Sequence, residues 1–280
     1  MKWNAYWRLM RFDKPVGTLL LWFPTAWALW IANRGIPSLK LLILFFSGTV
    51  LMRAAGCVIN DIADRDIDKH VTRTKLRPLT SGELNLQEAL TLLAVLLFSA
   101  LLILINLPWD CFYLGCIALC ISFLYPFCKR FLSAPQFVLG LAFSMGIPMA
   151  FVASNIPLNV ECALLFVLNF AWIVAYDTMY AMTDKEDDLR IGVKSTAIYF
   201  ASYDRLIIGL LQCLLHGLWL YLALNMHANK WFYIFWFAAA VVLYHQQKLI
   251  SKREHASCLR AFIISVYYGA FMWLAVGVGA

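Results

Sequence analysis

Carboxylate side chains are scarce in this chain of 280 residues, and most of them lie in two short stretches. Nine of the 16 Asp and Glu residues are found there, namely Asp61, Asp64, Asp66 and Asp68 in the first and Asp177, Asp184, Glu186, Asp187 and Asp188 in the second. Carboxylates held together in a low-dielectric setting repel one another, and a hard divalent cation removes that repulsion. The two stretches therefore predict binding of divalent metal ions.

The spacing within each stretch places a subset of these side chains on one helical face. The two subsets are Asn60, Asp64 and Asp68, and Asp177, Asp184 and Asp188. Both Asp64 to Asp184 and Asp68 to Asp188 are separations of 120 residues, which predicts two pseudo-repeated halves around one central cavity. The acidic residues off these faces are expected to be solvated or ion-paired; they are Asp61, Asp66, Glu186 and Asp187.

Basic residues accompany the carboxylates. They are Arg73, Arg77, Lys129, Arg130 and Lys194, and Tyr125 lies one turn before Lys129. Mg²⁺ usually binds through one or two carboxylates together with substrate phosphates. Two incomplete carboxylate sites beside several cations therefore predict a Mg²⁺–diphosphate site, although any single loop arginine is more often only a topology signal.

The elements that carry these residues are predicted to be transmembrane helices. Hydrophobic residues make up 62% of the chain and charged residues 14%, whereas soluble domains are about 45–50% apolar. An embedded backbone must satisfy its own hydrogen bonds, which favours an all-α bundle. We expect nine spans in a single domain over 1–280, at about 15–33, 38–62, 86–107, 110–128, 134–154, 159–181, 203–224, 230–248 and 257–279.

The distribution of Lys and Arg predicts the orientation of the bundle. With nine spans, 19 of the 23 basic residues fall on the side of the N-terminus, which the positive-inside rule places in the cytoplasm. The C-terminus is then outside, segments 63–85 and 182–202 are cytoplasmic loops, and 1–14 is an amphipathic segment at the membrane interface. Basic residues in cytoplasmic loops explain the net charge of +7, so no nucleic-acid partner is expected.

The aspartate motifs resemble those of the UbiA superfamily of intramembrane prenyltransferases. Residues 60–68 read NDIADRDID and match the pattern N-D-x-x-D-x-x-x-D, followed by RTKLRPL at 73–79. The second motif reads YDTMYAMTDKEDD at 176–188, followed by GVKST at 192–196, and the opening RFDKPVGT at 11–18 is also similar. The resemblance extends over nearly the whole chain.

The resemblance implies a Mg²⁺-dependent enzyme of ubiquinone biosynthesis in the bacterial cytoplasmic (inner) membrane. It implies a polyprenyl diphosphate donor, a 4-hydroxybenzoate acceptor, surrounding membrane lipid and no obligate protein partner. Its implied metal ligands are Asn60, Asp64, Asp68, Asp177, Asp184 and Asp188, of which Asp64, Asp68, Asp184 and Asp188 are also its implied catalytic residues. Its implied diphosphate contacts are Arg73, Tyr125 and Lys129, beside which we place Arg77 and Lys194.

Arg53 is implied to meet the carboxylate of the acceptor. It is the basic residue that lies well inside a predicted span, where a cation needs an anionic partner. That partner is either the benzoate or a nearby aspartate. The base that removes the ring proton is likewise open between a carboxylate of the second motif and the released pyrophosphate.

Other functions remain as alternatives at this point. A cation-coupled transporter also carries intramembrane carboxylates, but it usually places them near the midplane on broken helices. A structural scaffold would not need aspartates on one helical face. Within the superfamily, a haem, a naphthoate or a chlorin could replace 4-hydroxybenzoate as the acceptor.

Overall fold

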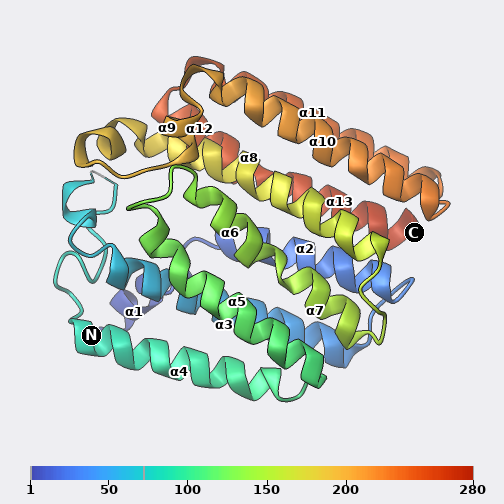
Figure 1. Cartoon of the computed structure of the whole chain (residues 1–280), viewed down its shortest axis with the longest axis horizontal. Coiled ribbons are helices and arrows are strands. Elements are labelled where there is room, and N and C mark those ends of the chain that lie inside the picture. The colour runs from blue at the N-terminus through green and yellow to red at the C-terminus, as the bar shows by residue number, and fades with distance from the viewer. Residues whose placement is uncertain (1, 72, 280) are drawn as a thin grey trace.

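The computed structural model describes residues 2–71 and 73–279, and these form a bundle of helices (Figure 1). The α-helices are α1 (Trp3–Leu9), α2 (Val16–Ala32), α3 (Leu39–Ala63), α4 (Leu86–Leu104), α5 (Trp109–Cys128), α6 (Pro135–Ser144), α7 (Gly146–Ala153), α8 (Val160–Ile191), α9 (Thr196–Tyr199), α10 (Asp204–Asn225), α11 (Lys230–Leu249), α12 (His255–Ile263) and α13 (Ser265–Gly279). Short 3₁₀ turns are η1 (Asp68–His70), η2 (Ala201–Tyr203) and η3 (Ile250–Lys252). The predicted all-α class is confirmed.

Seven helical stretches within the described ranges are long and apolar enough to cross a membrane. They are Leu39–Ala63, Leu86–Leu104, Trp109–Cys128, Pro135–Ala153, Val160–Ile191, Ala201–Asn225 and His255–Gly279. Two further predicted spans are helices that do not meet this criterion. Helix α2 is apolar but has 17 residues, and α11 contains Lys230, His245 and Lys248. The multispan bundle is therefore established, and the count of nine spans remains a prediction.

Two of the predicted spans are interrupted. The segment expected at 134–154 divides into α6 and α7 at Met145, because Pro148 has no N–H to donate to Ser144 and its ring crowds that carbonyl. The segment expected at 257–279 divides into α12 and α13. There the Ala261 carbonyl accepts a hydrogen bond from Nε2 of Gln246 at 2.9 Å, and a side chain that binds a helix carbonyl perturbs the helix at that point.

Helix α8 is longer than the sequence indicated. It continues from the predicted span end at 181 to Ile191 and stops at Gly192, which has a φ of +74°. Glycine reaches this left-handed conformation without steric cost and commonly ends helices. Residues 182–191 of the predicted loop 182–202 are therefore helical, and Asp184 and Asp188 lie on the same helix as Asp177, as their spacing indicated. The cytoplasmic side of this segment remains a prediction.

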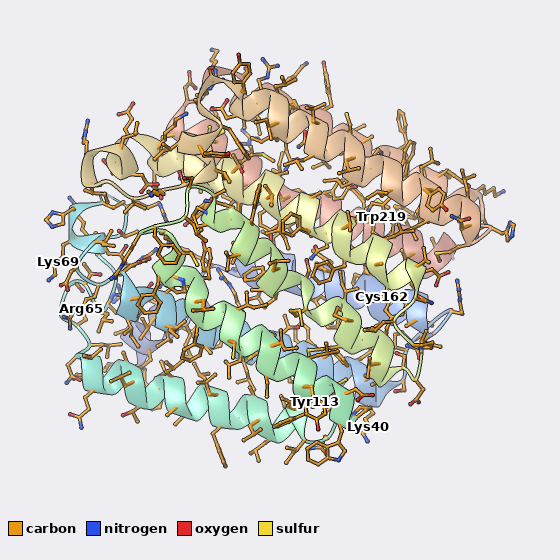
Figure 2. All side chains as sticks on the ribbon, viewed as in Figure 1. Lys40, Arg65, Lys69, Tyr113, Cys162 and Trp219 are labelled. Atoms are coloured by element: carbon orange, nitrogen blue, oxygen red, sulfur yellow. The ribbon has the colours of Figure 1, made fainter. Side chains whose placement is uncertain are left out.

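The buried side chains form two hydrophobic clusters. The larger joins α2, α8, α10 and α13 around Trp27, whose ring centroid lies 5.1 Å from that of Trp172 and 5.2 Å from that of Trp219. The smaller joins α1, α3 and α4 around Leu9 and Val58. Figure 2 shows Trp219 among the helices, with Arg65 and Lys69 at one end of the bundle and Lys40 at the other. The two clusters fix α3 and α8, which carry the aspartate motifs.

Candidate active site

A cavity of about 1370 Å³ opens among α2, α3, α5, α6 and α8. The site residues that the sequence predicted line it, from three helices and three connecting segments. These residues are Arg53, Asn60, Asp64, Asp68, Arg73, Arg77, Tyr125, Lys129, Asp177, Asp184, Asp188 and Lys194. The fold therefore brings together two motifs that lie more than 100 residues apart in the sequence.

The first motif leaves α3 but keeps a helical register. Helix α3 ends at Ala63, yet the Asp64 N–H donates to the Asn60 carbonyl at 2.9 Å and the Asp68 N–H donates to the Asp64 carbonyl at 2.8 Å. The Arg130 guanidinium donates to the Ala63 carbonyl at 2.9 Å, which satisfies one of the free carbonyls at the helix end. The three predicted ligands thus remain one turn apart, while Arg130 has a structural contact at this helix end.

Lys129 and Arg77 pair with the first motif. The Lys129 ammonium lies 2.9 Å from Oδ2 of Asp64 and 3.2 Å from Oδ1 of Asn60. Nη1 of Arg77 lies 2.6 Å from Oδ2 of Asp68. The Lys129 ammonium also lies 5.4 Å from the centroid of the Tyr125 ring, within reach of a cation–π interaction. The negative charge of this motif is therefore balanced by cations from α5 and from the 64–85 connection.

Arg73, in the connection that follows the first motif, pairs with the second motif. Its Nε lies 3.0 and 3.2 Å from the two carboxylate oxygens of Asp184, and its Nη1 donates to the hydroxyl of Tyr180. The guanidinium carbon also stacks 4.7 Å from the centroid of the Tyr180 ring. Asp188 lies one turn beyond Asp184 on the same cavity wall. Arg73 thus orients one predicted metal ligand.

Tyr180 is a contact that the sequence analysis did not single out. It lies four residues before Asp184 on α8, and its ring centroid lies 4.6 Å from that of Phe262 on α12. The i, i+4 spacing from Asp184 was the available signal, because residues at this spacing share a helical face. An aromatic residue inside an apolar span gives little indication by itself that it contacts a charged site.

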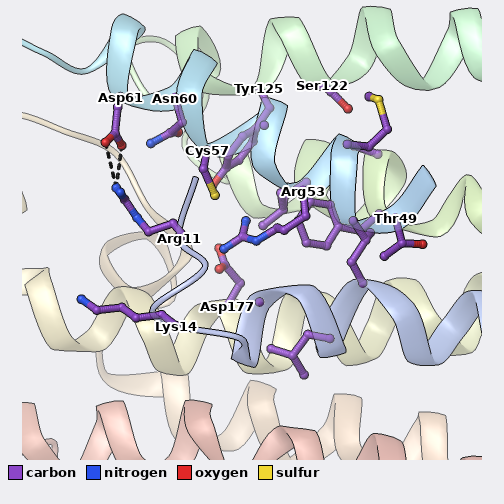
Figure 3. A pocket seen from close by; sticks show the side chains of 18 of the residues that line it. Arg11, Lys14, Thr49, Arg53, Cys57, Asn60, Asp61, Ser122, Tyr125 and Asp177 are labelled. Carbon is purple, nitrogen blue, oxygen red and sulfur yellow. Dashed lines mark hydrogen bonds and ion pairs between the residues drawn. The ribbon is translucent and has the colours of Figure 1, made fainter. Parts of the chain in front are cut away.

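Asp61, which was expected to be solvated or ion-paired, is buried in an ion-pair network. It is 1% exposed; Nη2 of Arg11 lies 2.7 and 2.9 Å from its two carboxylate oxygens, and Nη1 of Arg77 lies 3.0 Å from Oδ1. Figure 3 shows the Arg11–Asp61 pair at the edge of the pocket. Asp61 therefore fixes Arg77, which in turn holds Asp68.

Lys194 does not point its charge at the carboxylates. Its ammonium donates to the Phe131 carbonyl at 2.9 Å, and its backbone N–H donates to the Lys129 carbonyl at 3.0 Å. It therefore joins the segment after α8 to the end of α5. The predicted role of Lys194 in binding diphosphate remains a proposal that would require its side chain to turn.

Electrostatic effects at the polar end follow from burial and ion pairing. Burial raises the pKa of Asp68, and the nearby Arg77 opposes that rise without cancelling it. Burial, the largest single effect, would lower the pKa of Lys129, but the Asp64 carboxylate and Tyr125 together outweigh it and raise the pKa. The pKa of Arg77 is raised in the same way, since Asp61, Asp68 and Tyr180 together outweigh its burial. The cations of this site are therefore fixed positive charges.

Arg53 lies deeper in the cavity, on α3 two turns before Asn60. Figure 3 shows its guanidinium in the pocket interior, on the side of Asp177, whose carboxylate is close enough to interact with its charge. Its guanidinium also lies against Gly17 of α2. Among the side chains that the structure describes, none makes a hydrogen bond or ion pair with Arg53. Arg53 is thus available to an anion that enters the cavity.

The residues present fit a Mg²⁺ ion that shares its coordination with substrate. Oδ1 of Asp64 is buried and has no hydrogen-bond partner, and such a carboxylate oxygen suits a hard cation. Within 2–71 and 73–279, no three His, Cys, Asp or Glu side chains converge into a complete metal cluster. Mg²⁺ usually takes one or two carboxylates and completes its coordination with waters and phosphate oxygens.

An apolar part of the cavity lies between α3, α4 and α5. Its lining includes Leu44, Gly48, Leu97, Phe98, Leu101, Leu104, Gly115 and Leu119. Phe98 is 61% exposed and Leu101 is 42% exposed, although both also line the cavity. The cavity therefore joins a charged end to an apolar region that opens at the outer surface between α4 and α5.

Comparison with known proteins gives matches over nearly the whole chain. A model of the UbiA prenyltransferase family matches residues 21–275. The chain is 64% identical over 275 residues to the 4-hydroxybenzoate octaprenyltransferase of Legionella pneumophila (strain Corby), which covers 98% of each chain. The match includes both aspartate motifs, which lie within the aligned family region.

Solved structures share the fold. A UbiA homolog from Aeropyrum pernix K1 superposes with a TM-score of 0.79 at 23% identity, covering 91% of this chain and 96% of the other. A UbiA homolog from Archaeoglobus fulgidus bound to GPP and Mg²⁺ gives a TM-score of 0.68 at 21% identity and covers 98% of both chains. At these identities the likeness supports the helical architecture.

Proposed function

The chain belongs to the UbiA prenyltransferase family, and we propose that it transfers a polyprenyl group from polyprenyl diphosphate to 4-hydroxybenzoate. The group is joined to the ring carbon ortho to the hydroxyl, the bond from the allylic carbon to the diphosphate oxygen breaks, and the ring proton is lost. The observation that carries the proposal is that both aspartate motifs and Arg53 line one cavity. The identity of 64% to a 4-hydroxybenzoate octaprenyltransferase supports the choice of acceptor.

The charged end of the cavity is proposed to hold the diphosphate with Mg²⁺. Asn60, Asp64 and Asp68 would hold one ion, and Asp177, Asp184 and Asp188 would supply ligands for another. Bound Mg²⁺ supplies positive charge that stabilises the departing diphosphate. The UbiA homolog from A. fulgidus bound to GPP and Mg²⁺ supports this cofactor for the family fold.

The ion pairs of the site are suited to an exchange of partners. Lys129 holds Asp64, and Arg73 holds Asp184. Asp64 and Asp184 would hold Mg²⁺ when it is bound, and Lys129 and Arg73 would then be free to contact phosphate oxygens of the donor. Charge balance is kept throughout, so the developing negative charge meets preorganised cations. Arg77 would remain fixed through Asp61.

The apolar region between α3, α4 and α5 is proposed to hold the prenyl chain. Its exposed rim at Phe98 and Leu101 faces outward, so a chain longer than the cavity can continue into lipid. Apolar walls also keep water from the allylic cation, which water would otherwise capture. Gly115 lies opposite Leu104, where an added Cβ would meet a Leu104 methyl carbon at 2.9 Å, so this contact limits the width of the region.

The acceptor is proposed to bind through its carboxylate at Arg53. A guanidinium can form two parallel hydrogen bonds with a carboxylate, which fixes the orientation of the ring. Arg53 and the first aspartate motif lie on the same helix, two turns apart. The aromatic acid would then lie between its anchor and the allylic carbon of the donor.

The protein is proposed to lie in the bacterial inner membrane with nine spans, its N-terminus in the cytoplasm and its C-terminus outside. Helix α1 and the end of α13 lie at opposite ends of the bundle (Figure 1), which supports termini on opposite sides. Helices α2 and α11 would complete the nine spans. The pseudo-repeat is supported by the equal separations of the two aspartate pairs.

A panel of acceptors tests the proposal. Purified protein in lipid nanodiscs is supplied with octaprenyl diphosphate, Mg²⁺ and either 4-hydroxybenzoate or 1,4-dihydroxy-2-naphthoate, and products are separated by mass spectrometry. We expect kcat/KM for 4-hydroxybenzoate to exceed that for the naphthoate at least tenfold. Preferential prenylation of the naphthoate would be consistent with the family assignment but would contradict 4-hydroxybenzoate as the acceptor.

A further inference from the structure

Gly17 and Arg53 are in close contact across the interface between α2 and α3. A Cβ atom built on Gly17 would lie 2.3 Å from Nη2, 2.6 Å from Cζ and 2.6 Å from Nε of Arg53. These three atoms belong to the guanidinium, so its whole planar group rests on the bare face of Gly17. Both residues line the cavity, and Gly17 is buried.

We propose that Gly17 is a specificity-determining residue that positions Arg53 to receive the carboxylate of the aromatic acceptor. This inference rests on the proposed function, in which Arg53 binds that carboxylate. The absence of a side chain at residue 17 fixes where the guanidinium lies relative to the first aspartate motif. Any side chain there would push the guanidinium into the cavity or away from it.

The backbone conformation at residue 17 does not itself require glycine. It lies in the first turn of α2, after Val16, and its φ is not in the left-handed region. In a helix, replacing Gly with Ala ordinarily favours the folded state. The atom that would be displaced belongs to the flexible end of Arg53, so the backbone can remain in place. If Gly17→Ala impairs activity, the cause would therefore be displacement of the Arg53 guanidinium.

The consequence for binding follows from geometry. A bidentate contact requires both the distance and the plane of the guanidinium to match the carboxylate. Misplacement of a binding group by about 1 Å can reduce activity about 10²-fold. Gly17 therefore controls the affinity for a carboxylate-bearing acceptor, and an acceptor without that carboxylate should be insensitive to the substitution.

Gly17→Ala and the matched variant Gly217→Ala test the proposal. Gly217 lies inside α10, away from the cavity lining, and a Cβ there would meet no atom within 4 Å. We expect Gly17→Ala to raise the acceptor KM at least about tenfold, while the donor KM changes less than twofold. Both variants should unfold thermally at or above the wild-type temperature. A Gly17→Ala protein with an unchanged acceptor KM would overturn the proposal.

A double-mutant cycle separates this inference from the function on which it rests. If Gly17 acts through Arg53, Gly17→Ala should add no further increase in acceptor KM to the Arg53→Ala protein. Additive increases would show that Gly17 acts independently and would overturn the inference. If Arg53→Ala raises the acceptor KM while Gly17→Ala does not, only the role of Gly17 falls. If Arg53→Ala leaves the acceptor KM unchanged, the proposed anchor at Arg53 falls, and the role of Gly17 falls with it.

Discussion

The ammonium of Lys129 lies 2.9 Å from Oδ2 of Asp64, while Oδ1 of the same carboxylate is buried without a hydrogen-bond partner. One carboxylate therefore balances a cation of α5 and also offers a free oxygen to the cavity. Arg73 and Asp184 form the corresponding pair at the second motif. At the charged end of the cavity, the carboxylates could thus bind Mg²⁺ and the cations could bind phosphate oxygens.

Asp64→Ala is expected to abolish prenyl transfer while the protein still folds and inserts. The substitution removes the oxygen proposed for Mg²⁺ and leaves the diphosphate under-neutralised. Asp66→Ala is the control, since Asp66 lies outside the helical face, its side chain is 73% exposed and it pairs with Lys69. Turnover measured at saturating Mg²⁺ checks both variants, and wild-type turnover of Asp64→Ala would contradict the proposed metal site.

Asp61→Ala is expected to destabilise the protein strongly. Asp61 is the shared partner of Arg11 and Arg77, and breaking a buried ion pair costs roughly 3–5 kcal/mol. Since both arginine side chains are 16% exposed, we expect a loss toward the lower end of that range. Thermal unfolding in detergent measures the effect. A loss no larger than that of Asp66→Ala would show that the network does not stabilise the fold.

The helices could be predicted because long apolar runs and membrane thickness leave few other solutions. Their interruptions were harder to predict. Pro148 was visible in the sequence, but Gln246 reaches the Ala261 carbonyl only after α11 and α12 have packed. The predicted span was ended at 181 because residues 184–190 are highly charged. Charge argues against a membrane span but does not exclude the helix that the spacing of Asp177, Asp184 and Asp188 had indicated.

Most members of the site could be predicted, Tyr180 being an exception, but their pairings could not. All the site residues that spacing and motif resemblance named line the cavity. Which cation meets which carboxylate depends on how α5 and the 64–85 connection pack. For this reason the ion pair by which Asp61 holds Arg77 was not predicted. The hydrogen bonds of Arg130 and Lys194 to backbone carbonyls were not predicted either.

Arg53→Ala is expected to raise the KM for 4-hydroxybenzoate at least about tenfold, because losing one partner of a buried charge pair costs roughly 2–5 kcal/mol. The donor KM should change little, since other cations hold the diphosphate. Arg53→Lys should restore binding only in part, because an ammonium cannot form the bidentate contact. Steady-state kinetics with both substrates provide the measurement. A rise in the donor KM alone would assign Arg53 to the diphosphate.

Mg²⁺ affinity is expected to fall as the pH is lowered. Burial raises the pKa of Asp68 above its ordinary value despite Arg77, so Asp68 takes up a proton at a higher pH than a solvated carboxyl. Mg²⁺ binds the deprotonated form. Lowering the pH from about 8 toward about 5 should therefore raise the Mg²⁺ concentration needed for half-maximal activity. An unaltered pH dependence in Asp68→Asn would exclude Asp68 as the linked group.

The most direct test of the account is the structure of the product made by the purified protein. Octaprenyl diphosphate and 4-hydroxybenzoate are supplied with Mg²⁺ or with a chelator, and the product is examined by mass spectrometry and NMR. The account predicts one product, prenylated on the ring carbon ortho to the hydroxyl, that forms with Mg²⁺ and not with the chelator. Equal product formation in the chelator, or attachment at the carboxylate or phenol oxygen, would contradict it.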